Sequence, residues 1–402
     1  MLKSGCSVQI LFPSFVQEII MEKEKIKTPS QRFAEKTSGD RANPRFVRCL
    51  NPFRWLEVNE DGNVTPCCKP WFKGKLGSIR NKTMEEIWNG PAWKALREAM
   101  YEGGEWWKFC DAESCPHIQN DTWVPIDFIS PETPDQLPIP GEMLESIRNG
   151  KTTLDYGPIQ IGLSCDPRCN INCIMCTSKN NPDRSGELIR RALDGVHNSL
   201  PSVKRLKMLG DGEVFVVPEA REFLFNFDAD RYPDTGFLIH TNGLLLDEKM
   251  WEKISHLRID WLVISVDAAT KETYEKIRRG GKWEVISHNL ELAAEKNRAG
   301  RIGKFHLSMT VMRSNHTEMV EFAEMGKRLE ADSTYFYPVY GEFPSEQIFH
   351  PPDISCMKRI REQLKRPIMQ EKEIDYNALL YWKNWKPGVK DYARYLKKYL
   401  TG

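Results

Sequence analysis

Residues 158–176 read PIQIGLSCDPRCNINCIMC, and this stretch decides both the fold and the chemistry that the sequence predicts. Its first part, 158–164, has the length and the apolar residues typical of a buried β-strand. Cys169, Cys173 and Cys176 follow at the spacing C-x3-C-x2-C. Each iron of a cubane [4Fe–4S] cluster normally takes one thiolate, so three cysteines in one loop leave the fourth iron open. Cys165 is the alternative fourth ligand, but its place at the strand end favours the open site.

The residues after this stretch alternate between strand-like and helix-like patterns. Strand-like runs occupy 158–164, 203–209, 236–241, 260–266, 304–312 and 333–340, and helical patterns occupy 186–200, 218–227, 248–255, 283–297 and 317–329. Regular alternation predicts an α/β fold with a parallel sheet and right-handed crossovers. Six such units suit a partial (β/α)6 TIM-like barrel better than a closed eight-fold one. Active sites of such folds lie at the carboxyl ends of the strands.

Polar residues and glycines stand at the predicted carboxyl ends of the next four strands. They are Gly210, Gly212 and Glu213 after the second strand, Asn242 after the third, and Ser265 at the end of the fourth, with Arg278 further along the chain; the apolar Val311 stands at the end of the fifth. Glycines allow a ligand to approach the backbone closely, and a carboxylate can neutralise an ammonium group. Each of these motifs alone is readily explained by a turn, and Asp267 by a helix cap. Their occurrence on successive strand ends places them where the active sites of such folds lie.

A second group of cysteines lies in the first third of the chain. Cys49 and Cys67 flank an Asp-Gly pair between apolar alternations, which predicts a β-hairpin that brings the two thiols together. Cys110 and Cys115 close the segment, and four thiolates can fully ligate one [4Fe–4S] cluster. Zinc is the alternative, because four cysteines also suit its tetrahedral coordination, although tight C-x2-C pairs are missing.

Composition excludes several classes of function. The 402 residues carry a net charge of +1, which gives no global electrostatic case for binding nucleic acid or an anionic membrane. We find no run of eighteen or more apolar residues and therefore expect no transmembrane helix. Eleven cysteines, an odd number, without a credible export signal favour a cytoplasmic protein over a secreted disulfide framework. A charged run after Met21 suggests that translation starts there.

A Pro-rich stretch between the two cysteine groups predicts a linker and sets the domain limits. We expect a flexible extension at 1–43, a cysteine-rich domain at 44–123, a linker at 124–154, the barrel at 155–345 and a helical segment at 346–402.

The cysteine loop and the strand-end motifs together resemble the radical SAM superfamily over roughly residues 155–340. The resemblance implies that Cys169, Cys173 and Cys176 bind a [4Fe–4S] cluster whose open iron binds S-adenosylmethionine (SAM). It also implies that SAM is reductively cleaved to a 5′-deoxyadenosyl radical, which takes hydrogen from the substrate. The residues that it assigns to SAM binding are Gly210, Gly212, Glu213, Asn242, Ser265, Arg278 and Val311. Met175 stands where relatives often have an aromatic residue.

The first-third cysteines are similar to the SPASM/twitch auxiliary-cluster domain of many radical SAM enzymes. The shared pattern is a cysteine, twelve residues, a glycine, four residues, a second cysteine, and then a Leu-Gly-Asn-Ile-like stretch, here Leu-Gly-Ser-Ile. The block departs from the family in preceding the barrel and in supporting one cluster, which is closer to twitch. The resemblance implies that Cys49, Cys67, Cys110 and Cys115 bind an auxiliary [4Fe–4S] cluster, with Cys68 left over.

This resemblance implies an oxidoreductase or maturase that acts on a peptide or protein, or on a carbohydrate, by oxidation, cross-linking or epimerisation. A reductant such as flavodoxin or ferredoxin would be its partner. An epimerase needs a thiol that returns hydrogen, and Cys68, Cys165 and Cys356 are candidates, although a buried structural thiol is the commoner role. The alternatives are a non-catalytic iron–sulfur electron carrier and a zinc-stabilised interaction protein on a degenerate barrel.

Overall fold

The computed structural model describes most of the chain, and its described residues form two compact units. The described residues are 46–112, 115–119, 124–126, 129, 137, 139–178, 184–208, 212–339, 341, 343, 345–349, 352–376 and 379. Unit 1 takes those within Met1–Asp166, Ser185–Lys207 and Asp230–Gly236, and unit 2 those within Pro167–Arg184, Met208–Ala229 and Phe237–Gly402. The predicted extension, the suggested start at Met21 and Gly210 lie outside the described residues. The domain limits stay a prediction.

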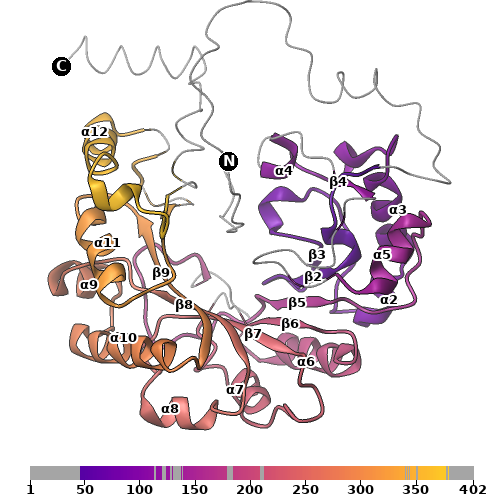
Figure 1. Ribbon diagram of the computed structural model, residues 1–402, viewed down its shortest axis with the longest axis horizontal. Coiled ribbons are helices and arrows are strands. Elements are labelled where there is room, and N and C mark those ends of the chain that lie inside the picture. Colours follow the sequence, from indigo (N-terminus) through magenta and orange to yellow (C-terminus); the bar gives the residue numbers. More distant parts are fainter. Residues whose placement is uncertain are drawn as a thin grey trace, which may run out of the picture. The chain divides into compact units, whose positions relative to one another are not determined.

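Unit 1 is built on strands in the order β3–β2–β5–β6 (Figure 1). Their bounds are β2 (Trp55–Val58), β3 (Val64–Thr65), β5 (Gln160–Leu163) and β6 (Arg205–Met208). The predicted hairpin is present, because β2 and β3 pair in antiparallel fashion around a turn in which Gly62 has a φ of +81°. Sequence analysis did not predict that β2 also pairs in parallel with β5. The cysteine-rich segment and the first strand of the predicted barrel therefore share one sheet.

Helices cover this sheet, and a small second sheet completes unit 1. The α-helices are α2 (Met84–Trp88), α3 (Pro91–Met100), α4 (Pro116–Gln119), α5 (Gly141–Arg148) and α6 (Glu187–Ser199). The 3-10 helices are η1 (Asn51–Phe53), η2 (Lys69–Trp71) and η3 (Trp106–Lys108), and β1 (Phe46–Val47) pairs with β4 (Val124–Pro125). Helix α5 falls within the predicted linker, because Met143, Leu144 and Ile147 form an apolar stripe that is buried.

A buried polar cluster crosses the sheet of unit 1. Glu57 of β2 stands opposite Gly162 of β5. Its carboxylate accepts hydrogen bonds from Trp55 Nε1 at 2.9 Å and Ser164 Oγ at 2.9 Å, and it pairs with Lys207 Nζ at 3.3 Å. A Cβ added at position 162 would lie 1.9 Å from Glu57 Oε2. Only glycine leaves room for this carboxylate.

Replacing Gly162 by alanine is therefore expected to destabilise the protein. Displacing the carboxylate breaks hydrogen bonds to a buried charge, which costs about 1–3 kcal/mol. Urea unfolding followed by circular dichroism should show a lower midpoint for this variant. Gly141→Ala is the matched control, because nothing lies within 4 Å of the added Cβ, and its midpoint should not fall. Equal midpoints for the two variants would contradict the account of this cluster.

Unit 2 consists of parallel strands in the order β7–β8–β9–β10–β11. Their bounds are β7 (Gly236–Thr241), β8 (Ile259–Ser265), β9 (Ile302–Val311), β10 (Ser333–Pro338) and β11 (Ile374–Asp375). The helices are α7 (Pro218–Phe225), α8 (Glu248–Lys253), α9 (Lys271–Ile277), α10 (Trp283–Arg298), α11 (Met319–Arg328) and α12 (Ile354–Gln363), followed by the 3-10 helix η6 (Pro367–Gln370). Each of the six predicted strands is present, and the predicted α/β class with a parallel sheet is confirmed. Neither α9 nor β11 was predicted.

The two faces of β9 differ in character. Leu307, Met309 and Val311 are wholly buried on the apolar face, and α10 and α11 pack against this strand. Ser308 and Thr310 alternate with them and point to the other face, since strand residues alternate in direction. The polar face of the strands is therefore the one available to a site.

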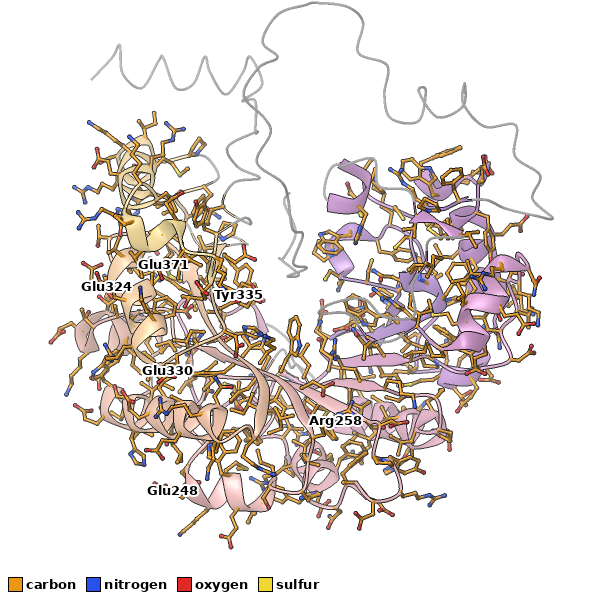
Figure 2. The ribbon with its side chains drawn as sticks, viewed as in Figure 1. Glu248, Arg258, Glu324, Glu330, Tyr335 and Glu371 are labelled. Atoms are coloured by element: carbon orange, nitrogen blue, oxygen red, sulfur yellow. The ribbon has the colours of Figure 1, made fainter. Side chains whose placement is uncertain are left out.

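Two residues other than glycine adopt a positive φ in the described part of unit 2. They are Asp267 at +66° and Glu330 at +54°. Glu330 follows α11 on the surface, where it pairs with Arg298 at 3.1 Å (Figure 2).

In the part of the chain that the structure describes, no helix has both the length and the apolar character needed to cross a membrane.

Candidate functional site

Cys169, Cys173 and Cys176 lie together on the loop that follows β5. Cys173 is buried, and the other two are half-buried. The pKa of Cys173 is raised to about 11, mainly by burial; the charge of Arg278 opposes the rise, and those of Asp267, Cys176 and Cys169 add to it. The thiols thus lie close enough to influence one another. Without a bound cation Cys173 keeps its proton at neutral pH, whereas coordination to a metal deprotonates a thiol. This donor set therefore suits a cationic iron–sulfur core.

Backbone hydrogen bonds hold this loop against the segment that follows α9. The Asn172 amide donates to the Arg279 carbonyl at 2.8 Å, and the Ile174 amide donates to the Ile277 carbonyl at 3.0 Å. The segment that carries Arg278 therefore fixes the backbone on either side of Cys173.

Glu213 connects the cysteine loop to the end of β7. Only 1% of the residue is exposed, and its carboxylate accepts from Thr241 Oγ1 at 2.6 Å and from the Asn242 amide at 2.7 Å. Its own amide donates to the Arg168 carbonyl at 2.9 Å, one residue before the first cysteine. Burial raises the pKa of Glu213, and these hydrogen bonds oppose the rise. The contacts that it makes here position backbone, and the neighbouring Gly212 is half-buried.

Asn242 contacts the first cysteine directly. Its Nδ2 donates to Asn170 Oδ1 at 2.9 Å and approaches Cys169 Sγ at 3.7 Å. Its Oδ1 accepts from the Leu244 amide at 3.0 Å, which fixes the orientation of the side chain. A donor at this sulfur withdraws electron density, and hydrogen bonds to cluster sulfurs raise the reduction potential.

Ser265 belongs to a chain of polar side chains on three neighbouring strands. His240 Nε2 lies 2.6 Å from Ser265 Oγ, and Ser308 Oγ donates to Ser265 Oγ at 3.1 Å. Sequence reasoning chose Ser265 but missed His240 and Ser308. Strand alternation was the signal that would have found them, because each is a polar residue on the same face near a strand end.

Arg278 forms a buried ion pair with Asp267. Its Nε and Nη2 lie 2.8 and 2.6 Å from Asp267 Oδ2, and Asp267 Oδ1 accepts from the Thr310 amide at 2.7 Å. Burial lowers the pKa of Arg278, but the charges of Asp267, Cys173 and Tyr274 and the hydrogen bond to Asp267 together outweigh this, and the net shift is upward. The interpretation of Asp267 as a helix cap is wrong, because Thr270 caps α9. The arginine is thus held in place next to Cys173.

Val311 differs from the other residues assigned to SAM. Its side chain is wholly buried, on the opposite face of β9 from Ser308 and Thr310. Strand alternation with the polar Ser308 and Thr310 was the signal in the sequence that would have shown this.

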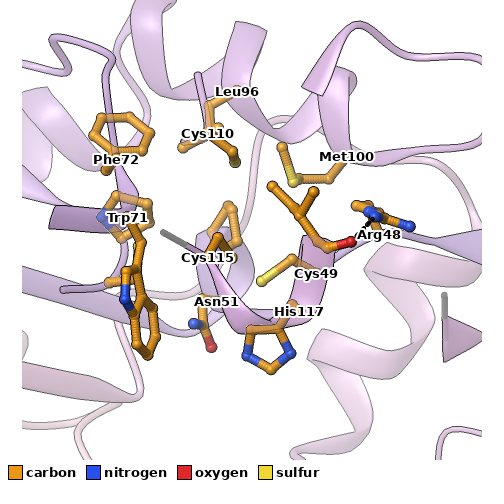
Figure 3. Close-up of a pocket in the computed structure, with 14 residues that line it drawn as sticks. Arg48, Cys49, Asn51, Trp71, Phe72, Leu96, Met100, Cys110, Cys115 and His117 are labelled. Atoms are coloured by element: carbon orange, nitrogen blue, oxygen red, sulfur yellow. Dashed lines mark hydrogen bonds between the residues drawn. The ribbon is translucent and has the colours of Figure 1, made fainter. Parts of the chain in front are cut away.

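Cys49, Cys67, Cys110 and Cys115 line one cavity in unit 1 (Figure 3). The cavity holds about 440 Å³, part of it open to solvent. Burial and the charges of the other three thiols raise the pKa of Cys67 well above its usual value, and burial raises the pKa of Cys115 to about 11. The predicted hairpin thus brings Cys49 and Cys67 to a common cavity, where Cys110 and Cys115 join them.

Four separate elements deliver these thiols. Cys49 lies between β1 and η1, Cys67 follows β3, and Cys115 precedes α4. The backbone of Cys110 pairs with that of Phe72 in an isolated antiparallel β-bridge. Trp71, Phe72, Leu96, Met100 and Ile118 give the cavity an apolar wall. Cys68 is buried at the start of η2 and is not among the lining residues.

Binding a single metal ion requires its ligands to converge on one point, which is a stricter requirement than lining a common cavity. Among the described residues, no group of three or more His, Cys, Asp or Glu side chains is arranged to hold one metal ion. The four thiols nevertheless share a cavity whose donors are sulfur atoms, and thiolates are the ligands of iron–sulfur clusters.

Two family models match the chain. Residues 163–326 match the Radical SAM superfamily, and residues 49–116 match SPASM, described as an iron-sulfur cluster-binding domain.

Curated relatives are similar over parts of their length. A "Probable GTP 3',8-cyclase" of Methanococcus maripaludis is 31% identical over 136 residues, which cover 33% of this chain and 44% of the relative. The FeMo cofactor biosynthesis protein NifB of Chlorobaculum tepidum is 24% identical, with 56% and 58% covered. The mycofactocin maturase MftC of Mycobacterium tuberculosis is 26% identical, with 48% and 47% covered. The chain spans about half the length of these relatives.

Solved structures are similar at a lower level. SuiB of Streptococcus suis bound to the precursor peptide SuiA has a TM-score of 0.42 at 14% identity, covering 60% of this chain and 56% of that one. The enzyme anSMEcpe with bound AdoMet has a TM-score of 0.38 at 14% identity, covering 52% and 59%.

The resemblance found in the sequence is confirmed by the family models, including the unusual order of the two domains. The match to the Radical SAM model implies a [4Fe–4S] cluster and SAM as cofactors, and the SPASM match implies a second iron–sulfur site. The chain therefore contains a domain of the Radical SAM superfamily at residues 163–326, preceded by a SPASM iron–sulfur cluster-binding domain at residues 49–116.

Proposed function

We propose that the chain is an enzyme in which Cys169, Cys173 and Cys176 bind a [4Fe–4S] cluster, and SAM occupies its open iron. The observation that carries this proposal is the grouping of three thiols on one anchored loop, inside the region that matches the radical SAM model. When bound, the cluster and SAM supply a radical that abstracts hydrogen from an unactivated carbon.

The protein's own residues fix the geometry around these thiols. Asn242 donates toward the sulfur of Cys169, and the Arg278 cation stabilises the Cys173 thiolate. Glu213 is hydrogen-bonded both to the end of β7 and to the residue before the first cysteine, and so holds these two segments together. We assign SAM binding to Gly210, Gly212, Glu213, Asn242, Ser265, Arg278 and Val311. In this set Glu213 acts by positioning backbone, and Val311 contributes through its main chain, since its side chain faces away.

We further propose that Cys49, Cys67, Cys110 and Cys115 bind an auxiliary [4Fe–4S] cluster. Their common cavity and the SPASM match support four-thiolate ligation. A fully ligated cluster has no open iron, so it suits electron transfer better than substrate activation. It would take up the electron that a substrate radical releases, making the net reaction an oxidation.

The substrate we propose is a peptide or protein, or a carbohydrate, modified by oxidation, cross-linking or epimerisation. The name of MftC as a maturase supports a peptide or protein substrate, although the chain spans only 47% of that relative. The cyclase and NifB names belong to different reactions. A flavodoxin or ferredoxin is the expected source of electrons.

The test of this function is anaerobic reconstitution with iron and sulfide, followed by dithionite and SAM. We expect about eight irons per chain, from two four-iron clusters, and formation of 5′-deoxyadenosine. A non-catalytic iron–sulfur carrier would give iron without 5′-deoxyadenosine, and a zinc-stabilised protein would remain colourless. Either of these results would refute the proposal.

A further inference from the structure

The cavity of the four cysteines carries a positive charge in its wall. Arg48 lines it and is only 2% exposed. The guanidinium carbon lies 4.8 Å from the ring centre of Trp106. Figure 3 marks the second contact of Arg48, in which Nη2 donates to the Ile118 carbonyl at 3.4 Å. These two contacts hold the cation on the side of the cavity near Cys49. Arg48 therefore lines the same cavity as all four cysteines, and it directly precedes Cys49 in the chain.

A second arginine, Arg54, lies at the end of η1 and contacts one of the residues that line the cavity. Arg54 Nε and Nη2 donate to Asn51 Oδ1 at 3.4 and 3.3 Å, and Asn51 lines the cavity. Burial lowers the pKa of Arg54, whereas the charge of Cys49 raises it. Arg54 is half-buried, so water screens its charge more than that of Arg48.

No carboxylate in the described lining of the cavity offsets the positive charge of the arginines. Among the described residues that line the cavity, none is an aspartate or a glutamate. Four thiolates around an oxidised [4Fe–4S] core give a net charge of −2, and one added electron makes it −3. A fixed cation nearby favours the more negative state, because the Coulomb energy is large where water is excluded. Net charge and solvent exposure are among the factors that set cluster potentials.

We propose that Arg48 and Arg54 raise the reduction potential of the auxiliary centre and so make it an electron acceptor. This inference rests on the proposed function, which supplies the cluster. In the oxidation, the substrate radical loses one electron to the centre and one proton to solvent. The centre returns to its oxidised state by passing that electron to the flavodoxin or ferredoxin partner.

The test is a redox titration followed by EPR spectroscopy on the full-length, anaerobically reconstituted protein. Replacing Cys169, Cys173 and Cys176 together by alanine leaves the auxiliary signal alone. In this background, Arg48→Gln should lower the equilibrium constant for electron uptake about tenfold or more, which is about 59 mV for one electron. Arg54→Gln should have a smaller effect of the same sign, and Arg48→Lys should retain most of the potential.

Lys73→Gln is the matched control. The Lys73 side chain is 50% exposed, and its charge also acts on Cys110. Solvent screening should leave the potential nearly unchanged in this variant. Shifts in both arginine variants no larger than that of the lysine variant would overturn the proposal. An Arg48→Lys variant whose reduction potential falls as far as that of Arg48→Gln would also overturn it, because the shift would then follow the shape of the side chain and not its charge. Wild-type protein without an auxiliary iron signal would instead refute the proposed function.

Discussion

The Cys173→Ala variant is expected to lose SAM cleavage. Cys173 is the buried member of the three thiols, and the cluster would be left with two ligands on the loop. Changes to residues that only support metal ligands typically cost about 10–100-fold in affinity or activity, so loss of a ligand should exceed that range. The measurement is the rate of 5′-deoxyadenosine formation with dithionite, together with iron content per chain.

Cys356→Ala is the control for this experiment. Cys356 is also a buried thiol of unit 2, but it lies in the first turn of α12 and outside the cysteine loop. Its replacement should leave both iron content and SAM cleavage at the wild-type level. Retained cleavage in Cys173→Ala, with full iron content, would mean that the cluster is bound elsewhere.

Replacing Asp267 by asparagine is expected to cause the largest loss of stability. The change removes the counter-ion of Arg278, of which only 7% is exposed, and leaves that cation buried. Breaking a buried ion pair in this way costs about 3–5 kcal/mol. Asparagine tolerates a positive φ, so the backbone at +66° should persist and the charge effect is isolated. Urea unfolding measures the loss, and SAM binding to the reconstituted protein should weaken in parallel.

Glu330→Gln provides a closely matched comparison. Glu330 is the other described residue besides glycine with a positive φ, and it also pairs with an arginine. The side chains of Arg298 and Glu330 are 43% and 62% exposed, and such pairs contribute about 0–1 kcal/mol. Similar losses in the two variants would show that the Asp267 pair is no more important than a surface contact.

The sequence predicted the repeating strands and helices because their signal is local. Apolar periodicity marks each strand, and Gly or polar residues mark each strand end, so 236–241 and 333–340 were assigned within two residues of β7 and β10. It did not predict β11, which has two residues and forms only by pairing with β10. A strand that short has no periodicity to detect.

Pairing between distant segments was equally hidden from the sequence. The parallel ladder between β2 and β5 joins segments about a hundred residues apart, and the sequence of neither strand indicates which strand it pairs with. The Pro-rich stretch between them indicated a linker and gave no sign of this pairing. Gly162 was the overlooked signal, because a glycine inside a strand often marks close approach by another group.

The cysteines show the same limit at the level of the site. Spacing alone indicated that Cys169, Cys173 and Cys176 act together, because eight residues of chain keep them close. The meeting of Cys49 and Cys115 depends on tertiary packing, and the sequence indicated it only through the presence of four cysteines in one segment. The partners of Glu213 and Arg278 were not predictable, since Thr241 ends β7 and Asp267 follows β8, and only the tertiary fold brings them to these side chains.

The central claim is that three thiolates leave one iron open for SAM, and the EPR spectrum of the reduced cluster tests it most directly. In the Cys67→Ala variant, which removes a proposed ligand of the auxiliary cluster, the remaining signal should come from the cluster on Cys169, Cys173 and Cys176. Adding SAM should change that spectrum, because the cofactor binds an iron of the cluster itself. A reduced cluster whose spectrum is identical with and without SAM would contradict the account.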